Sequence, residues 1–449
     1  MSAVVWFRRD LRLEDNPAWA EATSDHDEVR PLFIIDPKLW IPSHRLTQLI
    51  AHLHGLDAAI QKSSGRLCVM TGNPATVLKT VLAAGDDLYF NDDYSPYATK
   101  RDNAVTYAFG ERVKRMNGTA VHAPGTILTN SETPYKVFTP FHRRWADQEL
   151  PAPARQGKAK VTDDVGEGLP QLSETPLMEG GPKAARKRLA EFEKVVDDYA
   201  DLRNRPDLDS TSHLSADLKF GTLSPVRVMI EIGSKTPSRA AFVRQIAWRD
   251  FYMHLMHHFP HTVEAPLRPE YRDLWWRNDE DAFIKWKTGN TGYPIIDAGM
   301  RQLLSEGWMH NRVRMLTASF LVKDLLIDWR WGEQHFMKLL VDGDVAQNVG
   351  NWQWVAGTGA DAAPYFRIFN PVTQGKKFDP DGDYVRRYVP ELSELGSAHI
   401  HDPWGAGPLE LAAAGIELGD HYPLPMVDHA EARQEALAMY EMARGQSDG

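Results

Sequence analysis

Short apolar runs that alternate with helical patterns in the first 127 residues constrain the fold of this chain more than any other feature. Each run ends in a polar or glycine-containing turn and has the length of a buried strand. The runs are residues 4–7, 31–35, 67–70 and 88–90. Between them, apolar residues recur three and four apart, as from Leu46 to Ile60. This alternation predicts a doubly wound parallel α/β sheet over residues 1–127.

The turns that follow these strands are a first candidate site, because ligands of such sheets bind beyond the carboxyl ends of the strands. Arg8-Arg9-Asp10 and Asn91-Asp92-Asp93 are two of these turns. Every α/β domain has turns of this kind, so they do not identify a ligand.

The rest of the chain divides at Pro182. Residues 128–180 are rich in proline, glycine and small polar residues and predict a long interdomain linker, with one aromatic cluster at 136–141 that could pack on a domain. Residues 181–449 predict an all-helical domain. The expected helices are 239–258, 281–287, 295–306, 312–329 and 333–340.

The composition limits the classes of protein that fit. A chain of 449 residues with 43% hydrophobic residues is expected to form two or three domains. Its one cysteine, Cys68, excludes an intrachain disulfide and a thiolate metal cluster and fits a reducing cytoplasm. Nothing near the N-terminus is apolar for long enough to be a membrane span or a signal peptide. We therefore expect a cytoplasmic protein.

The net charge of −10 argues against a generic nucleic-acid binder, which would be basic overall. Between residues 301 and 323, however, the sequence has four Lys or Arg residues and only one acidic residue, Glu306. A basic patch on an acidic protein therefore remains possible.

The stretch from Asp342 to Trp354 is the second candidate site. It combines two carboxylates, the amide of Asn348, two glycines and two tryptophans, and no simple packing period explains that combination. Carboxylates can accept hydrogen bonds from ribose hydroxyls or heterocyclic N–H groups, and tryptophans can stack on rings. The alternative is a helix end with capping acids and core tryptophans.

Three further patterns have structural and functional interpretations. The hydroxyl-rich run 211–215 precedes a helical stretch and suits a pyrophosphate, although plain N-capping also explains it. Nine of the 14 tryptophans lie between 248 and 354. This clustering suggests that some of them stack on ligands or transfer electrons, and ordinary core packing is the alternative for each one. The histidines at 254, 257, 258 and 261 lack a paired acid and are interpreted as surface residues, so no metal is expected.

Several long motifs in one order closely resemble the DNA photolyase/cryptochrome family, and within it the class I cyclobutane pyrimidine dimer photolyases. The motifs are residues 6–13, 248–252, 291–298, 307–312, 342–354 and 364–371. The resemblance implies an α/β antenna-binding domain over 1–127, a linker over 128–180, and a helical FAD- and DNA-binding domain over 181–449.

The resemblance also implies which residues bind FAD. Asp342 would reach the flavin and pair with Arg314, and Asn348 would face flavin N5. Asparagine is typical of photolyases at this position, whereas plant cryptochromes commonly have Asp and animal ones Cys. The implied FAD-binding set is Tyr199, Thr211, Ser212, His213, Leu214, Ser215, Phe242, Arg249, Arg314, Asp342, Asp344 and Asn348.

Two further groups of residues follow from the resemblance. Trp352, Trp329 and Trp276 match the family's electron-transfer triad, from flavin to surface. A dimer flipped from the duplex would stack between two tryptophans, and nearby arginines would bind phosphate. The implied DNA-binding set is Arg203, Gln245, Trp248, Asn311, Arg312, Met315, Trp354 and Gln374.

Two positions depart from the family pattern. The dimer-binding glutamate is Gln245 here, and an amide can donate a hydrogen bond but cannot supply a proton. The segment 96–102 lacks the pattern of folate-binding members, which favours an 8-hydroxy-5-deazaflavin antenna over methenyltetrahydrofolate, with Arg45 as a possible contact.

The expected activity is the light-driven repair of cyclobutane pyrimidine dimers by electron transfer from excited reduced FAD, a carbon–carbon lyase reaction. The alternatives are a cryptochrome-type blue-light sensor and a photolyase for (6-4) photoproducts. The expected partner is UV-damaged DNA, with no membrane and no obligate protein partner, and the expected state is a monomer.

Overall fold

The computed structural model describes residues 2–447, which form two compact units. Of the described residues, unit 1 comprises 2–200, 212–260 and 341–346, and unit 2 comprises 201–211, 261–340 and 347–447. The predicted boundaries at 127 and 180 rest on sequence and remain a prediction. No helix among the described residues is both long and apolar enough to cross a membrane.

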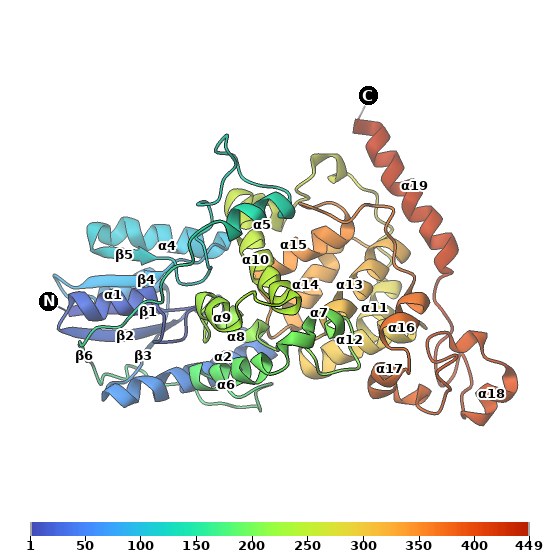
Figure 1. The fold of residues 1–449 in the computed structure, drawn as a ribbon, viewed down its shortest axis with the longest axis horizontal. Coiled ribbons are helices and arrows are strands. Elements are labelled where there is room, and N and C mark those ends of the chain that lie inside the picture. Colours follow the sequence, from blue (N-terminus) through green and yellow to red (C-terminus); the bar gives the residue numbers. More distant parts are fainter. Residues whose placement is uncertain (1, 448–449) are drawn as a thin grey trace. The chain divides into compact units, whose positions relative to one another are not determined.

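Unit 1 contains the predicted parallel sheet (Figure 1). Its strands run in the order β3-β2-β1-β4-β5, and β6 pairs with β2. The strands are β1 Ser2–Phe7, β2 Glu28–Ile35, β3 Cys68–Thr71, β4 Asp87–Asn91, β5 Val113–Met116 and β6 Lys160–Val161. The prediction of an α/β domain followed by a mainly helical remainder is confirmed.

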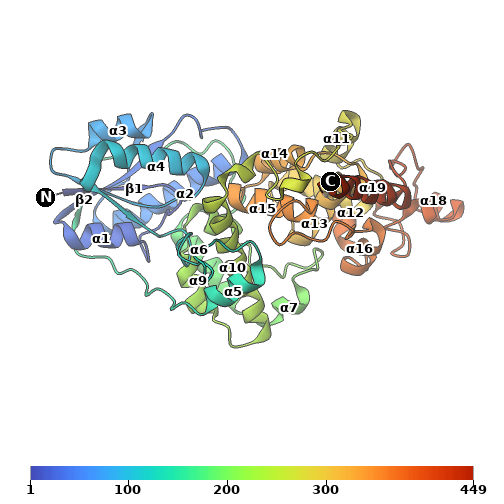
Figure 2. The ribbon, with the colours of Figure 1, turned by 90° about the horizontal axis from the view of Figure 1, so that it is seen from above.

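Helices cover both faces of this sheet. The helices of unit 1 are α1 Pro17–Asp25, α2 His44–Ile60, α3 Pro74–Val81, α4 Pro96–Phe109, α5 Phe138–Ala146, α6 Pro182–Glu193, α8 Ser215–Phe220, α9 Pro225–Ile232 and α10 Pro237–His258. Alternate residues of β1 point to opposite faces, so Val5 packs with α1 and α2, and Val4 packs with α3 and α4. Figure 2 shows α3 and α4 on one side of the sheet and α1 on the other. Proline at the first turn begins most of these helices, as in α10 after the N-cap Thr236.

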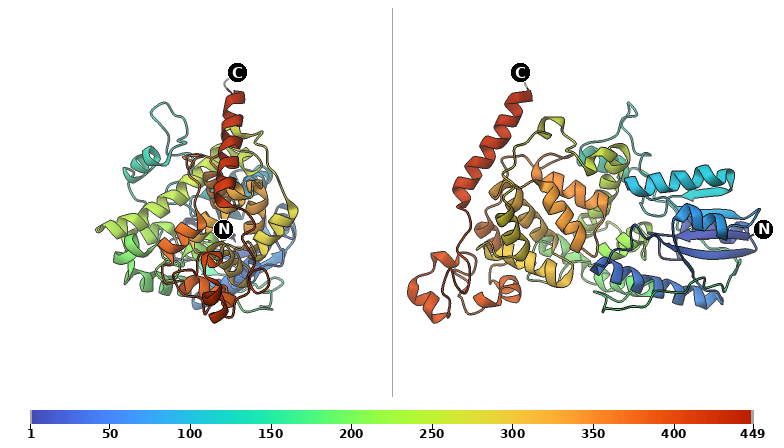
Figure 3. Two further views of the ribbon diagram at one scale, coloured as in Figure 1. Left: turned by 90° about the vertical axis from the view of Figure 1, so that its right-hand side faces the viewer. Right: turned by 180° about the vertical axis from the view of Figure 1, so that it is seen from behind.

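Unit 2 is built from helices and turns (Figure 3). Its helices are α11 Glu280–Thr288, α12 Pro294–Glu306, α13 Asn311–Ser319, the π-helix η6 Phe320–Asp324, α14 Trp329–Leu339, α15 Val345–Ala356, α16 Pro371–Phe378, α17 Asp383–Tyr388, α18 Pro408–Ala413 and α19 His429–Ser447. The short helix α7, Tyr199–Leu202, crosses the boundary between the units, and α15 begins two residues before Gln347.

The predicted continuous helix over 312–329 is wrong. The α-helix ends at Ser319, a π-helix follows, and Leu326 adopts a positive φ of 53° before Asp328 caps α14. Every residue from Leu316 to Trp329 is buried, so the sequence offers no polar face whose end would mark the break.

The linker contains structure that its composition did not predict. The aromatic cluster forms α5, and Lys160-Val161 forms β6 on the edge of the sheet. His254 is also buried, against Phe141 of α5, so its interpretation as a surface residue is wrong. Among the described residues no group of three or more His, Cys, Asp or Glu side chains could hold a metal ion.

Candidate functional site

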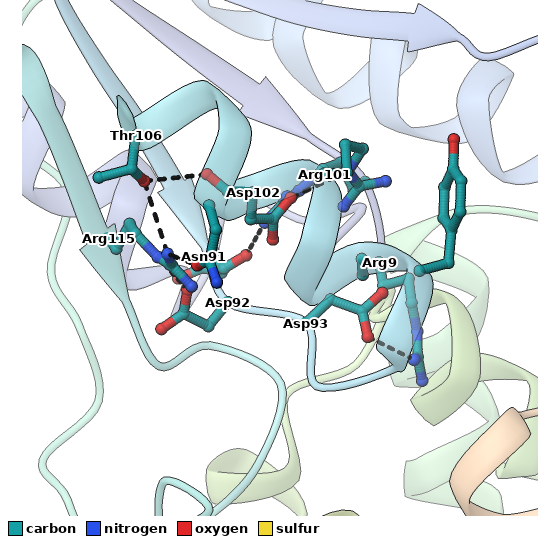
Figure 4. Close-up of polar contacts among 12 residues, drawn as sticks. Arg9, Asn91, Asp92, Asp93, Arg101, Asp102, Thr106 and Arg115 are labelled. Atoms are coloured by element: carbon teal, nitrogen blue, oxygen red, sulfur yellow. Dashed lines mark hydrogen bonds and ion pairs between the residues drawn. The ribbon is translucent and has the colours of Figure 1, made fainter. Parts of the chain in front are cut away.

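The first candidate site lies where β1 and β4 end, next to each other in the sheet. From β1 the following strands β2 and β3 are added on one side, and β4 and β5 are added on the other. Doubly wound folds bind ligands at the point where the order of strands switches in this way. Arg101 bonds to the buried carboxylate of Asp102 (Figure 4). Arg8 bonds to the same carboxylate oxygen. Both guanidinium groups also lie over the Trp6 ring, at 4.6 and 4.9 Å from its centroid. Arg8 also donates to the Asn91 carbonyl at the end of β4, so the turns after β1 and β4 converge, and α4 adds Arg101 and Asp102 to a buried ionic cluster.

A second ionic cluster extends from the same turns to Asp344, and its residues all belong to unit 1. Arg9 bonds to Asp93 at 3.1 Å and also to Asp344. Burial opposes the charge on Arg9, but the two carboxylates prevail and raise the pKa of Arg9. Lys219 lies among the same groups, and burial, aided by the charge of Arg9, lowers the pKa of Lys219 to about 7.

The carboxylates of Asp342 and Asp344 are nearly inaccessible, with 9% and 6% of each residue exposed. Arg45 of α2 is close enough for the charge of Asp342 to act on its pKa, which burial lowers. Arg45 was predicted to contact the antenna chromophore. In the structure its charge lies near Asp342, which was predicted to bind FAD. Buried carboxylates next to cations occur both in ligand sites and in structural ion-pair networks, so the functional interpretation of this stretch remains a prediction.

The other predicted FAD-binding residues of unit 1 lie on α7, on α10, and on α8 with the run that precedes it. Phe242 is buried, and its ring packs edge-on against Tyr199 at 5.3 Å. Arg249 donates to the carbonyls of Thr119 and Leu218 at 2.6 and 3.1 Å, and burial lowers the pKa of Arg249.

The hydroxyl-rich run leads into α8. Within it, Ser212 Oγ accepts from the Leu214 N–H at 3.3 Å, and His213 has a positive φ of 51°. Leu214 is buried, and Ser215, the first residue of α8, is exposed. Thr211 is assigned to unit 2, as is Arg314, whose Nε donates to the Met309 carbonyl at 2.7 Å. The predicted Arg314–Asp342 pair joins residues of the two units and remains a prediction.

Within unit 2, the side chain of Asn348 has a defined orientation. Its Nδ2 donates to the Glu333 carbonyl at 2.9 Å and to Glu333 Oε1 at 2.8 Å. Both amide hydrogens are then used, so the oxygen is the end that can serve a ligand as acceptor. Burial raises the pKa of Glu333.

The predicted electron-transfer tryptophans all belong to unit 2. Trp352 on α15 and Trp329 at the start of α14 are buried, and Trp276 is half-buried. Gly332 lies one turn after Trp329, and a Cβ atom added there would come 2.2 Å from the Trp352 ring. Trp329 and Gly332 share a face of α14, so this face is turned toward Trp352. The segment of Trp276 adjoins the start of α14, since Asn278 Oδ1 accepts from the Asp328 N–H at 2.8 Å.

Two of the predicted DNA-binding arginines are neighbours within unit 2. Burial lowers the pKa of Arg312, and the charge of Arg203 adds to this effect. The Arg312 guanidinium donates to Asn204 Oδ1 at 2.8 Å and lies 4.5 Å from the Phe378 ring centroid. Two like charges held together are suited to an anion such as phosphate.

The remaining predicted DNA-binding residues lie on four helices. Asn311 and Met315 are one turn apart on α13, with Asn311 Nδ2 3.9 Å from the Met315 sulfur. Gln374 is half-buried on α16, and Trp354 is half-buried on α15, two residues after the buried Trp352. On a helix, residues two apart point in different directions, so the two tryptophans of the motif are not interchangeable.

Gln245 and Trp248 lie on α10 in unit 1. The Gln245 amide donates to the carbonyl of Ala241, one turn earlier, at 3.2 Å. Trp248 is half-buried and stacks on Phe138 of α5, with ring centroids 3.7 Å apart and planes 7° apart.

Several residues of these sites were not found from the sequence. Arg9, Lys219 and Glu333 each contact or act on a predicted residue that is distant along the chain. Arg9 stands in the opening motif, so its position was noticed, but nothing local indicates that it meets Asp344. Phe138 was recognised only as part of an aromatic cluster.

The fold defines a class of protein, namely a chain with a doubly wound parallel α/β sheet in one unit and a helical second unit that contains the buried tryptophans Trp286, Trp329 and Trp352. Comparison with known proteins makes the class specific. The family described as "FAD binding domain of DNA photolyase" matches residues 242–442, and the family described as "DNA photolyase" matches residues 3–157.

The similarity to individual proteins covers nearly the whole chain. The deoxyribodipyrimidine photo-lyase of Agrobacterium fabrum is 41% identical, over 97% of each chain. The solved structure of a bacterial class III photolyase from Agrobacterium tumefaciens matches with a TM-score of 0.92 and 39% identity, over 99% of this chain and 98% of the other. An archaeal photolyase from Sulfolobus tokodaii, solved with two FAD molecules, matches with a TM-score of 0.86 and 34% identity, over 98% and 100% of the two chains.

The chain therefore belongs to the DNA photolyase family. It is a FAD-binding flavoprotein and a lyase of DNA repair. The class I subdivision remains a prediction, because one of these similar structures is a class III enzyme.

Proposed function

We propose that this enzyme uses light to split cyclobutane pyrimidine dimers in DNA, with FAD held in its reduced form. The orientation of Asn348 is the observation that carries the proposal. Glu333 occupies both amide hydrogens, so Asn348 offers an acceptor oxygen to its ligand. Reduced flavin has a hydrogen on N5 and can donate to that oxygen, whereas N5 of oxidised flavin has only a lone pair. This preference favours repair, which needs the reduced cofactor.

The chain offers groups of the right chemistry for each part of FAD. Buried Asp342 and Asp344 can accept from ribose and heterocyclic N–H groups, and Arg249 and the run 211–215 can bind the pyrophosphate. Phe242 and Tyr199 offer apolar surface. When bound, reduced FAD supplies the electron that light transfers to the dimer and that returns after the ring opens. The protein orients the cofactor, excludes water and holds the lesion.

The residues proposed to bind the lesion and the DNA around it are mainly aromatic, amide and basic side chains. Trp248 and Trp354 are half-buried, so each keeps ring surface on which an extruded base can stack. Asn311, Met315 and Gln245 would contact the pyrimidines, and Gln374 would bind DNA nearby. The adjacent Arg203 and Arg312 would neutralise phosphate.

The proposed electron path for reducing the flavin runs through Trp352, Trp329 and Trp276. The first two are buried and the third is half-buried, as expected for a path that ends near the surface. The close approach of Trp352 to α14 at Gly332 supports this order.

A second chromophore is part of the proposal, with a deazaflavin favoured over a folate. The support comes from the sequence, in which the segment 96–102 lacks the pattern of folate-binding members, and Arg45 is the predicted contact. The absorption spectrum of the purified protein tests this point, because flavin and deazaflavin have different bands. A spectrum with flavin bands alone would contradict it.

We further propose that the enzyme is a monomer in the cytoplasm without an obligate protein partner. The single cysteine, which is buried, is compatible with a reducing compartment. Light scattering of the purified protein at several concentrations would test the monomeric state.

Illumination of the reduced protein with dimer-containing DNA tests the activity. We expect the ultraviolet absorbance of the pyrimidines to return in the light and not in the dark. Parallel reactions with (6-4) photoproducts and with undamaged DNA separate the alternatives. Repair of only the (6-4) lesion would assign the other substrate, and photoreduction without repair of either lesion would indicate a light sensor.

A further inference from the structure

The linker helix α5 is held against α10 by specific contacts within unit 1. Trp145 of α5 donates from Nε1 to the buried Asp250 of α10 at 3.0 Å. Phe141 of α5 packs on Phe251 at 5.1 Å between ring centroids. A segment with the composition of a flexible connector is therefore a fixed part of this unit.

Phe138, the first residue of α5, makes a different kind of contact. Its ring lies parallel to the Trp248 ring at 3.7 Å, which is the closest ring pair among those recorded for the described residues. Phe251 meets both rings edge-on, at 5.7 Å from Phe138 and 5.6 Å from Trp248. Arg244, one turn before Trp248 on α10, lies 5.0 Å from the Phe138 ring centroid.

This arrangement fixes the plane of the Trp248 indole. Phe138 is completely buried, whereas Trp248 is half-buried. A partly exposed tryptophan on a helix would otherwise sample several rotamers, and binding a base would cost the entropy of selecting one of them. A buried ring stacked against it removes that cost before the ligand arrives.

We propose that Phe138 is a positioning residue for lesion recognition, which holds Trp248 in the orientation that stacks on an extruded pyrimidine dimer. The linker then contributes to damage recognition as well as to the connection between domains. The inference rests on the proposed function, because it assumes that Trp248 contacts the lesion.

The substitution Phe138→Leu tests the role, because leucine retains apolar volume and removes the stacking ring. We expect the affinity for dimer-containing DNA to fall roughly three- to tenfold, the equivalent of ordering one side chain on binding. The affinity for undamaged DNA and the repair yield per flash of the bound complex should not change, because Trp248 still adopts the productive orientation once the lesion is bound.

Phe141→Leu is the matched control. Phe141 has the same residue type on the same helix and is equally buried, but it contacts Phe251 and His254 and has no recorded ring contact with Trp248. The Phe141→Leu variant should lower the thermal unfolding midpoint about as much as Phe138→Leu does. It should leave unchanged the ratio of the affinity for dimer-containing DNA to the affinity for undamaged DNA. Equal changes of that ratio in both variants would overturn the proposal.

A double-mutant cycle isolates the path through Trp248. In a Trp248→Ala background, Phe138→Leu should have no further effect on dimer affinity. If the loss of affinity persists in that background, Phe138 acts by another route and the proposal is wrong. Failure of the proposed function has a different signature, since the wild-type protein would then show no preference for dimer DNA.

Discussion

At the scale of single residues, the orientation of a predicted site residue is decided by its neighbours in the fold, which its own identity does not reveal. Asn348 was identified by its place in a motif, but the end of its amide that faces a ligand is decided by Glu333, fifteen residues earlier. Trp352 was likewise identified from the sequence, and the absence of a side chain at Gly332 is what lets it approach α14.

Replacing Glu333 with leucine should make the reduced flavin less stable. The Asn348 amide would keep its bond to the backbone carbonyl of residue 333 but lose the bond to Oε1, so the acceptor oxygen would be held less firmly. Since one hydrogen bond is worth about 1 kcal/mol, we expect reoxidation in air after photoreduction to be roughly three- to tenfold faster. Glu333→Gln is the control, because its amide oxygen can still accept, and its reoxidation rate should stay near that of wild type. Equal rates in all three proteins would contradict the role of Glu333.

Replacing Gly332 with alanine should disturb Trp352 directly. The new Cβ would lie 2.2 Å from the ring and 2.6 Å from the Leu321 side chain, so the ring has to move. Overpacking of this kind costs about 1–3 kcal/mol, which urea unfolding would measure. Photoreduction of the flavin should slow as well, because Trp352 would shift relative to α14. Gly407→Ala, where a Cβ would have open space, should change neither measurement.

At the scale of elements, the attachment of α5 to α10 depends on a carboxylate that is difficult to ionise. Asp250 accepts from Trp145 Nε1 and from the backbone N–H groups of Val121 and His122, at 3.0 to 3.1 Å. Burial raises the pKa of Asp250 to about 6, although Arg249, 3.9 Å away, acts in the opposite direction.

A pH dependence of stability follows from Asp250. Its unfolded pKa is about 4, so the folded state binds the proton more tightly than the unfolded state does. Its contribution to the free energy of unfolding is therefore fully present below pH 4 and is lost as pH rises through about 6. The loss is of the order of 2–3 kcal/mol. Asp250→Asn cannot titrate, so the stability difference between it and wild type should change between pH 4 and 6 and be constant above 7. A difference that is constant throughout would contradict this prediction.

The helices and strands also differ in how well the sequence predicts them. Strands and helices with a regular apolar pattern, such as β2 and α10, were found to within a few residues. The break between η6 and α14 was missed because every residue there is buried, and β6 was missed because two residues carry no periodicity. Helix α5 was missed because its segment contains Pro140 and is surrounded by linker-like sequence.

At the scale of the whole molecule, an acidic protein has to bind an acidic polymer. The net charge of −10 repels DNA, so attraction must come from a local group of cations. Arg203 and Arg312 form such a group within unit 2.

Replacing Arg312 with glutamine should reduce the salt dependence of DNA binding. If Arg312 neutralises one phosphate, the slope of log affinity against log salt should become less steep by about 0.9. Arg301→Gln is the control, because Arg301 is paired with Glu391 at 2.7 Å, and its slope should equal that of wild type. Fluorescence anisotropy over a range of salt concentrations measures both slopes. An unchanged slope for the Arg312 variant would remove this residue from the DNA-binding set.

The sequence by itself determined the α/β domain, the helical remainder and the family, because short-range periodicity reports burial and long motifs report shared ancestry. It also predicted a ligand site at the Asp342–Trp354 stretch, which remains a prediction. Only the tertiary structure decided which residues contact that stretch. Arg9 meets Asp344 from 335 positions away, and Phe138 stacks on Trp248 across 110 positions. Such pairs depend on how whole elements pack, and no local pattern of residues encodes that packing.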